Sequence, residues 1–388
     1  MKILIVSYTF PPCTNGAATV MYNICKYIPK RYYNVITAKS DVCLHSHGGH
    51  GSYDKDYVLD CNTIRLPVRT YGTLDRFKFF LLTIFWGLLL NKKNEFDCIL
   101  AVYPYPSDLL AGYVLRKITR KPLVIYMHDL WSEMKKGART YKIWKFLEIK
   151  IFSAASKILI MNKKYENHYL KRGIDNLTIF PPPIDLNQNK KTISSGIQFQ
   201  KKNLRIAFTG SVHRLNESAV LAFLKAAKKV GDIEVLFATP SKKNYLKKIS
   251  VGFLSKRECI KLQRNSDVLF LPLSPDALYP EEVKCAFPCK ALEYLAAGKP
   301  ILAVVPKGSF TEAFIKAHEV GIVVTDLSVK KIADAIEKLK DEERRKKLSQ
   351  SALQTAELFD AKILSKQLCS LLNNIVLNHK SSAPRSKL

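Results

Sequence analysis

Acidic residues are scarce in this chain of 388 residues: 33 aspartates and glutamates stand against 62 lysines and arginines, a formal net charge of +29. Such an excess of positive charge implies an anionic partner, which can be nucleic acid, a phosphate-rich substrate or the acidic face of a membrane. The lysines are dispersed, and no helix-turn-helix, zinc or aromatic-basic motif accompanies them. A nucleic-acid partner is therefore not expected.

Paired cysteines are also missing. The nine cysteines lack paired or regular spacing, which indicates reduced thiols in a cytosol and excludes a disulfide framework. No signal peptide is expected, because Met1-Lys2 leads straight into a strand-like run. The sequence predicts a cytoplasmic protein.

No apolar run is long enough to span a bilayer, which takes about 20 residues. The run FFLLTIFWGLLL over 79–90 is bounded by lysines and an arginine, and apolar residues surround the expected helix instead of forming one stripe. Two interpretations stay open: a core helix, or a helix that lies partly in a membrane interface with Trp86 and the flanking cations as anchors.

Metal-binding patterns are weak. His45, His47 and His50 lie close together in a polar stretch, which favours a solvated loop over a metal site. The aspartate pair of 54–56 lacks a preceding apolar strand. The sequence predicts neither a metal nor a bound cofactor.

What the chain does have is a regular alternation of strand-like and helical stretches, which occurs twice. A proline-rich crossing at 181–183 separates the two series. The alternation predicts an α/β fold of two Rossmann-like, doubly wound domains that face each other across a cleft. The expected parts are an N-terminal domain over 1–185, a linker over 186–203, a C-terminal domain over 204–358, a C-terminal helix over 359–377 that could return to the N-terminal domain, and a basic tail over 378–388.

The stretch 287–305 predicts a site for a nucleotide diphosphate. Phe287-Pro288 should open a helix, Gly298 should end it in the left-handed region, and a buried strand should follow. The helix N-terminus and Lys290 suit phosphate, and Glu293, three residues further on the same face, can accept hydrogen bonds from sugar hydroxyls.

Three other strand ends carry candidate ligand-binding residues. Asn15-Gly16 follows the first strand, where an ordinary strand-to-helix turn competes with a turn whose N–H groups face a ligand. His128 follows the strand at 123–127, and ligands of open α/β sheets bind beyond the carboxyl ends of strands. Gly210 lets the backbone approach a ligand, and Arg214 offers a guanidinium for phosphate oxygens, with a solvated surface charge as the alternative.

Six segments together resemble the GT-B-fold glycosyltransferases, and most of all the retaining, nucleotide-sugar-dependent enzymes of glycosyltransferase family 4 (group 1). They are KILIVSYTFPPCTNGAA at 2–18, YMHDLW at 126–131, ASKILIMNKKYENHYLKRG at 155–173, IFPPPID at 179–185, FTGSVHR at 208–214 and FPCKALEYLAAGKPIL at 287–302. The resemblance covers about 1–377. It implies that the N-terminal domain is the acceptor side and that the C-terminal domain binds the nucleotide sugar. It also implies that His128 approaches the donor sugar and that Arg214 lies beneath the diphosphate.

The chain departs from the family pattern at three places. Asn15 replaces the first glycine of the first loop. No lysine stands between FTGSVHR and Lys225, so that cationic role falls to Lys290. The family holds sugar and ribose with two glutamates, of which Glu293 matches the second and Cys285 occupies the position of the first. Either Glu281 or Glu282 is the substitute, or the donor sugar is held differently.

The resemblance implies transfer of a sugar from a nucleotide-diphosphate sugar to a glycan or lipid-linked saccharide in bacterial cell-surface polysaccharide synthesis. Transfer would be metal-independent and would retain the anomeric configuration. The enzyme would be cytoplasmic and peripheral at the inner face of the cell membrane. The expected catalytic residues are His128, Arg214, Lys290 and Glu293, and the expected donor-binding residues are Asn15, Gly16, Gly210, Arg214, Phe287, Pro288, Lys290 and Glu293. A nucleotide-sugar epimerase of the same fold and a catalytically weak basic scaffold or nucleic-acid-binding protein are the alternatives.

Overall fold

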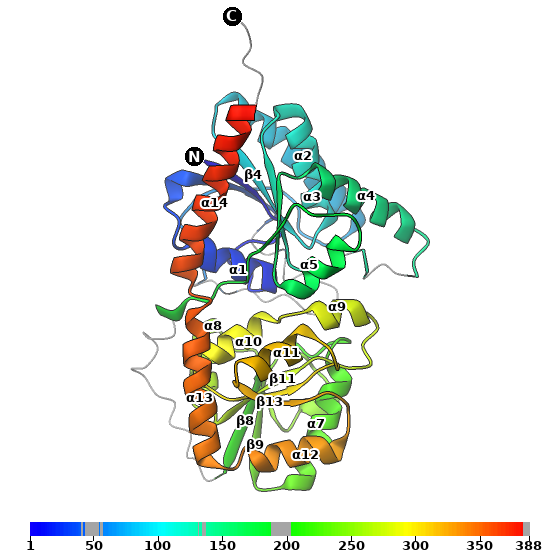
Figure 1. Ribbon diagram of the computed structural model, residues 1–388, viewed down its shortest axis with the longest axis vertical. Coiled ribbons are helices and arrows are strands. Elements are labelled where there is room, and N and C mark those ends of the chain that lie inside the picture. Colours follow the sequence, from blue (N-terminus) through cyan, green and yellow to red (C-terminus); the bar gives the residue numbers. More distant parts are fainter. Residues whose placement is uncertain are drawn as a thin grey trace, which may run out of the picture. The chain divides into compact units, whose positions relative to one another are not determined.

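The computed structural model describes residues 1–39, 42, 54, 57–130, 132–133, 137–187 and 203–382. It divides into two compact units. Unit 1 holds Met1–Pro182 together with the C-terminal segment from Ala361, and unit 2 holds Pro183–Asp360 (Figure 1).

Unit 1 contains a seven-stranded parallel sheet with the strand order β3-β2-β1-β4-β5-β6-β7. Its central strands are buried apolar runs, as expected for a sheet covered on both faces. The reversal of strand order occurs at β1, which pairs with both β2 and β4. The strands are β1 Ile3–Val6, β2 Tyr33–Thr37, β3 Asn62–Arg65, β4 Cys98–Tyr103, β5 Leu123–Met127, β6 Lys157–Ile160 and β7 Leu177–Ile179.

Helices cover the sheet of unit 1. The helix α1 packs against α14, the last helix of the chain, while α2 packs against α3, which also contacts α4 (Figure 1). Every fourth residue of α14 from Leu364 to Val376 is buried, and the Ser365 hydroxyl donates to the Ile24 carbonyl at 2.9 Å. The helices are α1 Gly16–Cys25, α2 Thr73–Lys92, α3 Pro106–Thr119, α4 Tyr141–Ala154, α5 Lys163–Leu170 and α14 Ala361–Ser382.

Unit 2 contains a six-stranded parallel sheet with the order β10-β9-β8-β11-β12-β13. The strands are β8 Leu204–Thr209, β9 Ile233–Ala238, β10 Ser250–Gly252, β11 Val268–Pro272, β12 Ile301–Val304 and β13 Gly321–Val324. The helices are α7 Glu217–Val230, α8 Lys256–Arg264, α9 Pro280–Cys285, α10 Cys289–Ala296, α11 Phe310–Ala317, α12 Val329–Lys338 and α13 Glu342–Glu357.

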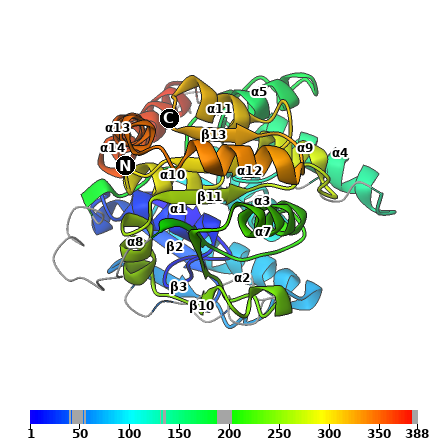
Figure 2. The same cartoon turned by 90° about the horizontal axis from the view of Figure 1, so that it is seen from below.

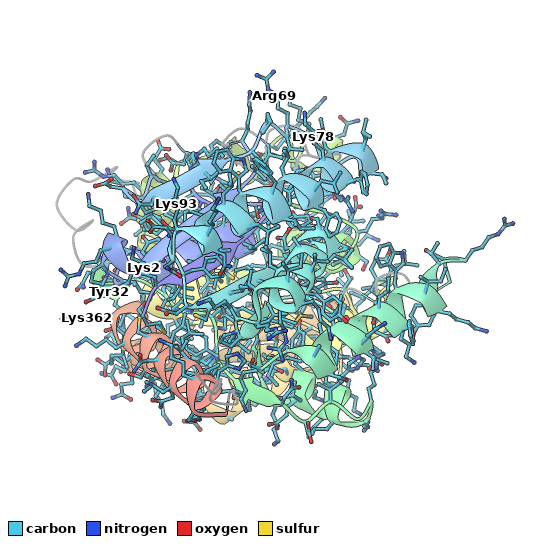
Figure 3. The ribbon with its side chains drawn as sticks, turned by 90° about the horizontal axis from the view of Figure 1, so that it is seen from above. Lys2, Tyr32, Arg69, Lys78, Lys93 and Lys362 are labelled. Atoms are coloured by element: carbon cyan, nitrogen blue, oxygen red, sulfur yellow. The ribbon has the colours of Figure 1, made fainter. Side chains whose placement is uncertain are left out.

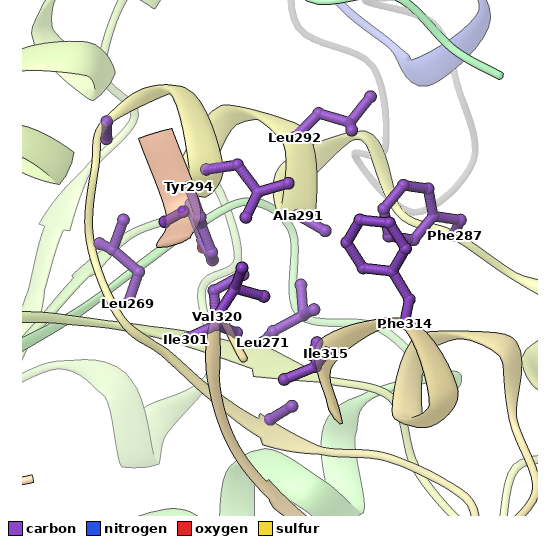
Figure 4. Close-up of a cluster of buried hydrophobic side chains, with 14 of the residues drawn as sticks. Leu269, Leu271, Phe287, Ala291, Leu292, Tyr294, Ile301, Phe314, Ile315 and Val320 are labelled. Carbon is purple, nitrogen blue, oxygen red and sulfur yellow. The ribbon is translucent and has the colours of Figure 1, made fainter. Parts of the chain in front are cut away.

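Two separate hydrophobic cores lie in unit 2. One joins α7 and α12, which lie side by side (Figure 2), to the sheet. The other packs α10 and α13 on the sheet and includes Phe287, Tyr294 and Phe314 (Figure 4). Because α10 is anchored in this second core, its polar face is held in a fixed position.

The predicted fold of two Rossmann-like α/β domains is confirmed, with several local corrections. Ser107 was expected to cap α3, but the helix begins at Pro106, whose fixed φ suits the first helical position. Pro288 was expected to be the first residue of α10, but it is the N-cap, and the helix begins at Cys289. Residues 280–285, expected as loop, form α9, which also begins with proline. The helix α4 was not predicted.

The C-terminal boundary also differs from expectation. The helix predicted over 359–377 begins at Ala361 and continues to Ser382, so residues 378–382 of the expected tail are helical. Most of the expected linker, and the histidines of the 45–50 stretch, lie outside the described residues.

Candidate functional site

Glu293 is the centre of a polar cluster in unit 2. It is buried on α10, and its Oε1 accepts from the Lys256 Nζ at 2.5 Å. Its Oε2 accepts from the Lys290 Nζ at 3.1 Å and from the Gln263 Nε2 at 3.0 Å. Lys290 keeps about a third of its side chain exposed, at 34%, so the cluster opens to solvent on the lysine side.

The two lysines keep Glu293 ionised. Burial alone would raise the pKa of this carboxyl, but Lys256 and Lys290 outweigh burial and lower the pKa to about 2. Burial alone would lower the pKa of Lys290, and the Glu293 carboxylate outweighs it and raises that pKa. An ionised carboxylate beside a partly exposed ammonium can bind hydroxyl donors and phosphate oxygens at adjacent points.

The structure brings Gly210 to this cluster. Gly210 has φ +151°, and a Cβ built on it would lie 3.6 Å from the Lys290 Cε. The preceding Thr209 is tied to the same helices, because its N–H donates to the Tyr294 hydroxyl at 3.2 Å and its Oγ1 accepts from Gln263 at 2.8 Å. The end of β8 and the start of α10 therefore lie together, and Gly210, Lys290 and Glu293 lie in one cluster, while their binding of a donor stays a prediction.

Arg214 lies on the turn after β8 but stays outside this network. The turn is braced by Asn216, whose Oδ1 accepts from the His213 N–H at 2.8 Å and whose Nδ2 donates to the Ser211 carbonyl at 3.1 Å. Arg214 is exposed, and within the described part of the chain it makes no hydrogen bond or ion pair. Its predicted role beneath a diphosphate therefore stays a prediction.

Phe287 and Pro288 contribute differently. The Phe287 ring packs in the core at 4.6 Å from the Phe314 centroid and 5.2 Å from that of Phe310. Only its backbone remains for a ligand. Pro288 sets the start of α10, whose first turn directs N–H groups outward, as every helix N-terminus does.

The position of the missing first glutamate is filled by a buried thiol. Cys285 is the last residue of α9 and is buried. Of the two expected substitutes, Glu281 is half-exposed and pairs with Lys284 at 3.6 Å, while Glu282 is buried.

His128 is the candidate residue of unit 1. It follows β5, is buried, and has no hydrogen-bond partner for Nδ1 or Nε2 in the described residues. Burial lowers its pKa to about 3, so the imidazole is neutral at physiological pH. The ring packs edge-on against Tyr126 at 4.4 Å, and Tyr165 donates to the His128 carbonyl at 3.1 Å. A buried imidazole with two unused nitrogens is suited to a ligand hydroxyl.

Asn15 has a structural role at the start of α1. Its Oδ1 accepts from the Ala18 N–H at 2.9 Å and so caps the helix, and the Thr9 hydroxyl lies 3.3 Å from it. Gly16 is exposed, with open space where a Cβ would stand. The strand-to-helix turn is thus present, and binding of a ligand at Asn15 or Gly16 stays a prediction.

Sequence reasoning missed two groups. Lys256 and Gln263 on α8 meet Glu293 from at least 30 residues away, and Ser255, with its capping box to Glu258, was the available signal for that helix start. At the carboxyl ends of β1 and β4, buried Asp108 accepts from the Tyr8 N–H at 2.7 Å, and burial raises its pKa well above the usual range.

Neither metal ligands nor a membrane span emerge from the described part of the chain. No group of three or more His, Cys, Asp or Glu side chains there could hold a metal ion. None of the helices in these ranges is both long and apolar enough to cross a bilayer.

Family models and solved structures both match this chain. Residues 14–188 match the family model described as Glycosyltransferase Family 4, and residues 241–355 match that of Glycosyl transferases group 1. No curated protein sequence matches the chain.

Solved structures of low sequence identity have the same fold. Sucrose-phosphate synthase from Thermosynechococcus elongatus has a TM-score of 0.72 at 15% identity, over 97% of this chain and 100% of that one. HepE from Anabaena in complex with UDP-glucose has a TM-score of 0.68 at 14% identity, over 96% and 100%. WaaG, a glycosyltransferase involved in lipopolysaccharide biosynthesis, has a TM-score of 0.66 at 14% identity, over 95% and 99%.

The two parallel-sheet domains therefore define a protein of the GT-B class. More specifically, the chain belongs to the group 1, family 4 glycosyltransferases and is a glycosyltransferase.

Proposed function

We propose that this enzyme transfers a sugar from a nucleotide-diphosphate sugar to a glycan or lipid-linked saccharide of a bacterial cell-surface polysaccharide. The observation that carries the proposal is the joined cluster of Gly210, Lys290 and Glu293 at the end of β8 and the start of α10. Lys290 suits the diphosphate and Glu293 the ribose hydroxyls. The complex of HepE with UDP-glucose supports this donor class.

In the proposed reaction the bond from the anomeric carbon to the diphosphate oxygen breaks. A bond to the acceptor oxygen forms on the same side, and the acceptor hydroxyl passes its proton to the departing diphosphate. The sugar carries oxocarbenium character and the leaving diphosphate gains negative charge. Lys290, Arg214 and the α10 N-terminus would stabilise that charge without a metal ion. His128 would orient the sugar as a neutral hydrogen-bonding group. Retention of configuration rests on the family resemblance.

Replacing the two cations tests the assignment. Lys290→Ala and Arg214→Ala are each expected to lower kcat by about a hundredfold to a thousandfold, since each removes one group that stabilises the transition state. Lys338→Ala, a charge change on α12, is the matched control. If the double variant Lys290→Ala/Arg214→Ala kept full turnover with the donor of the wild-type enzyme, neither residue would have this role.

The nucleotide can be identified by a thermal-shift screen against UDP, GDP, ADP and their sugars. A ligand that binds only the folded protein stabilises it by mass action and so raises the melting temperature. At a ligand concentration of a hundred times Kd, the free energy of unfolding rises by about 2.7 kcal/mol. A product analysis with the best donor then separates transfer from epimerisation: an isomerised nucleotide sugar without an acceptor product would contradict the proposal.

The acceptor side is proposed to work at an anionic membrane surface from the cytoplasm. The net charge of +29 supports this, because lysines near anionic lipid contribute about 1 kcal/mol each to attachment. WaaG, a structural neighbour, is described as acting in lipopolysaccharide biosynthesis, which agrees with a surface polysaccharide.

A further inference from the structure

The helix α2 has two apolar faces. One consists of Phe79, Thr83 and Gly87, which are buried. This face packs against α3 so closely that a Cβ added at Gly87 would lie 2.7 Å from the Leu115 methyl groups. With these four-residue steps the face forms a single stripe, and it is the fully buried side of the helix.

The second face points the other way. Leu74 is 80% exposed, Phe77 57% and Phe85 55%. Together with Leu81 and Leu89 they follow steps of three and four residues, which place them on one side of the helix, opposite the buried stripe. A helix with solvent on its outer side ordinarily has polar residues there, so this outer stripe is unexplained by folding.

The apolar surface continues beyond α2. Ile118, near the end of α3, is exposed, and on α4 Ile143 and Phe146 are exposed, Phe146 by 64%. Because α3 packs against both α2 and α4, the three helices are neighbours on one side of unit 1. The outer surface of α2–α4 consists of these exposed apolar residues: Leu74, Phe77, Leu81, Phe85, Leu89, Ile118, Ile143 and Phe146.

Cations border this surface, and the few carboxylates that its three helices carry are each bound to other groups. Figure 3 shows Lys78 and Lys93 toward the two ends of α2, with Arg69 beyond. Lys117, Lys142 and Lys150 add to them from α3 and α4.

Each carboxylate of the three helices is already bound. Asp75 accepts from the Thr70 N–H at 2.8 Å, buried Asp108 accepts from Tyr8, and buried Glu148 faces Arg172 at 3.6 Å.

We propose that the outer surface of α2–α4 docks on an anionic lipid bilayer, with its apolar side chains in the interfacial region and its lysines among the headgroups. Charge selects this occupant. A second copy would place one row of lysines against another, because a two-fold interface pairs like surfaces. An anionic bilayer accepts the apolar stripe and the cations together.

The position of the surface suits the proposed reaction. The purpose of lipid binding rests on that proposed function, whereas lipid binding itself does not. In the first turns of α2, the Phe79 ring packs at a tilt against Tyr8 with the ring centroids 4.8 Å apart. The Tyr8 ring centroid lies 5.7 Å from that of Tyr71 and 5.2 Å from that of Tyr105. This aromatic group links α2 to the carboxyl ends of β1 and β4. A lipid-anchored saccharide could reach those strand ends from a bilayer held at α2.

The test is flotation of the full chain with vesicles of phosphatidylcholine alone or with about 30% phosphatidylglycerol, at about 50 and 500 mM NaCl, either side of physiological screening. The wild type is expected to float with the anionic vesicles at low salt. The triple variant Phe77→Ser/Leu81→Ser/Phe85→Ser should weaken partition by on the order of a hundredfold.

A matched variant, Leu358→Ser/Ile363→Ser/Leu377→Ser, removes three similarly exposed apolar residues elsewhere. It should change partition by less than about twofold. The thermal shift of each variant with the nucleotide identified in the screen checks that the variant is folded. It also separates a loss of lipid binding from a failure of the proposed reaction.

Equal partition of the wild type and the α2 triple variant would overturn the proposal. So would a wild-type dimer in light scattering that this variant converts to monomer without loss of lipid binding.

Discussion

At Glu293 each carboxylate oxygen meets a lysine, so the side chain is oriented before any ligand arrives. Replacing it with Gln removes the charge and keeps the shape. We expect Glu293→Gln to weaken nucleotide binding by about 1.5–3 kcal/mol, about tenfold to a hundredfold in Kd, because hydrogen bonds to charged groups have that value. Calorimetric titration measures it, with exposed Glu343→Gln as control. Unchanged affinity in a folded variant would remove Glu293 from the site.

Lys256 governs how stability depends on pH. Glu293 has a pKa of about 2 when folded and about 4.3 unfolded, so its stabilisation is complete above about 4.3 and is lost as the pH falls toward 2. Lys256→Met removes one cation and raises that pKa. We expect Lys256→Met to lower the free energy of unfolding by about 1–3 kcal/mol above about pH 4.5. This difference from wild type should shrink as the pH falls toward about 2, and urea unfolding measures it.

The control for Lys256 is Lys331→Met, which breaks an exposed ion pair with Asp326. Its loss should stay below about 1 kcal/mol at every pH. If both substitutions cost the same, or if the loss at Lys256 did not depend on pH, the buried pair would not act as described.

The site could be predicted from the sequence only where its parts are local. Lys290 and Glu293 share a helical face, and the spacing of three residues reveals this. Lys256 reaches Glu293 across 37 positions of sequence, and no local pattern encodes such a contact. His128 could be placed at a strand end, but its burial and its unused ring nitrogens depend on Tyr126 and Tyr165, which only the fold brings near.

At the scale of elements, β13 depends on having no side chain at its first residue. A Cβ added at Gly321 would lie 2.0 Å from the Ile301 carbonyl oxygen, which belongs to the neighbouring backbone. Gly321→Ala should therefore force β12 and β13 apart and destabilise unit 2 by about 1–3 kcal/mol or more.

Thermal unfolding monitors this change, with hydrogen exchange in β12 as the local measurement. Gly16→Ala is the matched control, because open space surrounds that Cβ position, and its stability should stay within about 0.5 kcal/mol of wild type. An equal melting temperature for Gly321→Ala would show that the strands can adjust.

Element boundaries followed from sequence where one force dominated. Buried strands such as Cys98–Tyr103 and Leu204–Thr209 were placed to the residue, because continuous apolar runs end abruptly in polar turns. The helix α4 was missed because its outer side carries Ile143 and Phe146 where polar residues would be expected, so the amphipathic period is obscured. The same doubling of apolar faces left α2 open to two interpretations.

At the scale of the whole molecule, α14 completes unit 1 from the far end of the chain. Removing the residues after Asp360 would uncover apolar positions on α1 and delete the Ser365–Ile24 hydrogen bond. We expect amides of α1 to lose protection while those of α10 keep theirs, because unit 2 retains its own two cores. Hydrogen exchange resolved by peptide measures both regions in one sample. Equal loss in both units would mean that they unfold together.

The two-domain fold was predictable because the alternation of strands and helices occurs twice, and each half forms a parallel sheet. The boundaries of the two units were harder to predict from the sequence. Pro183–Asp185, expected in the first domain, belongs to unit 2, where the Ile184 N–H donates to the Phe359 carbonyl at 2.8 Å. That pairing joins the two crossing segments of the chain and has no local signal.

The return of α14 also sets an order for biosynthesis. A ribosome releases the chain from its N-terminus, so every strand of unit 2 has emerged before the helix that α1 requires is translated. The half that starts first is the last to be finished, and during this interval the nascent chain exposes the apolar flank of α1. A chaperone that binds such flanks could act during this interval, which ends when α14 packs on α1.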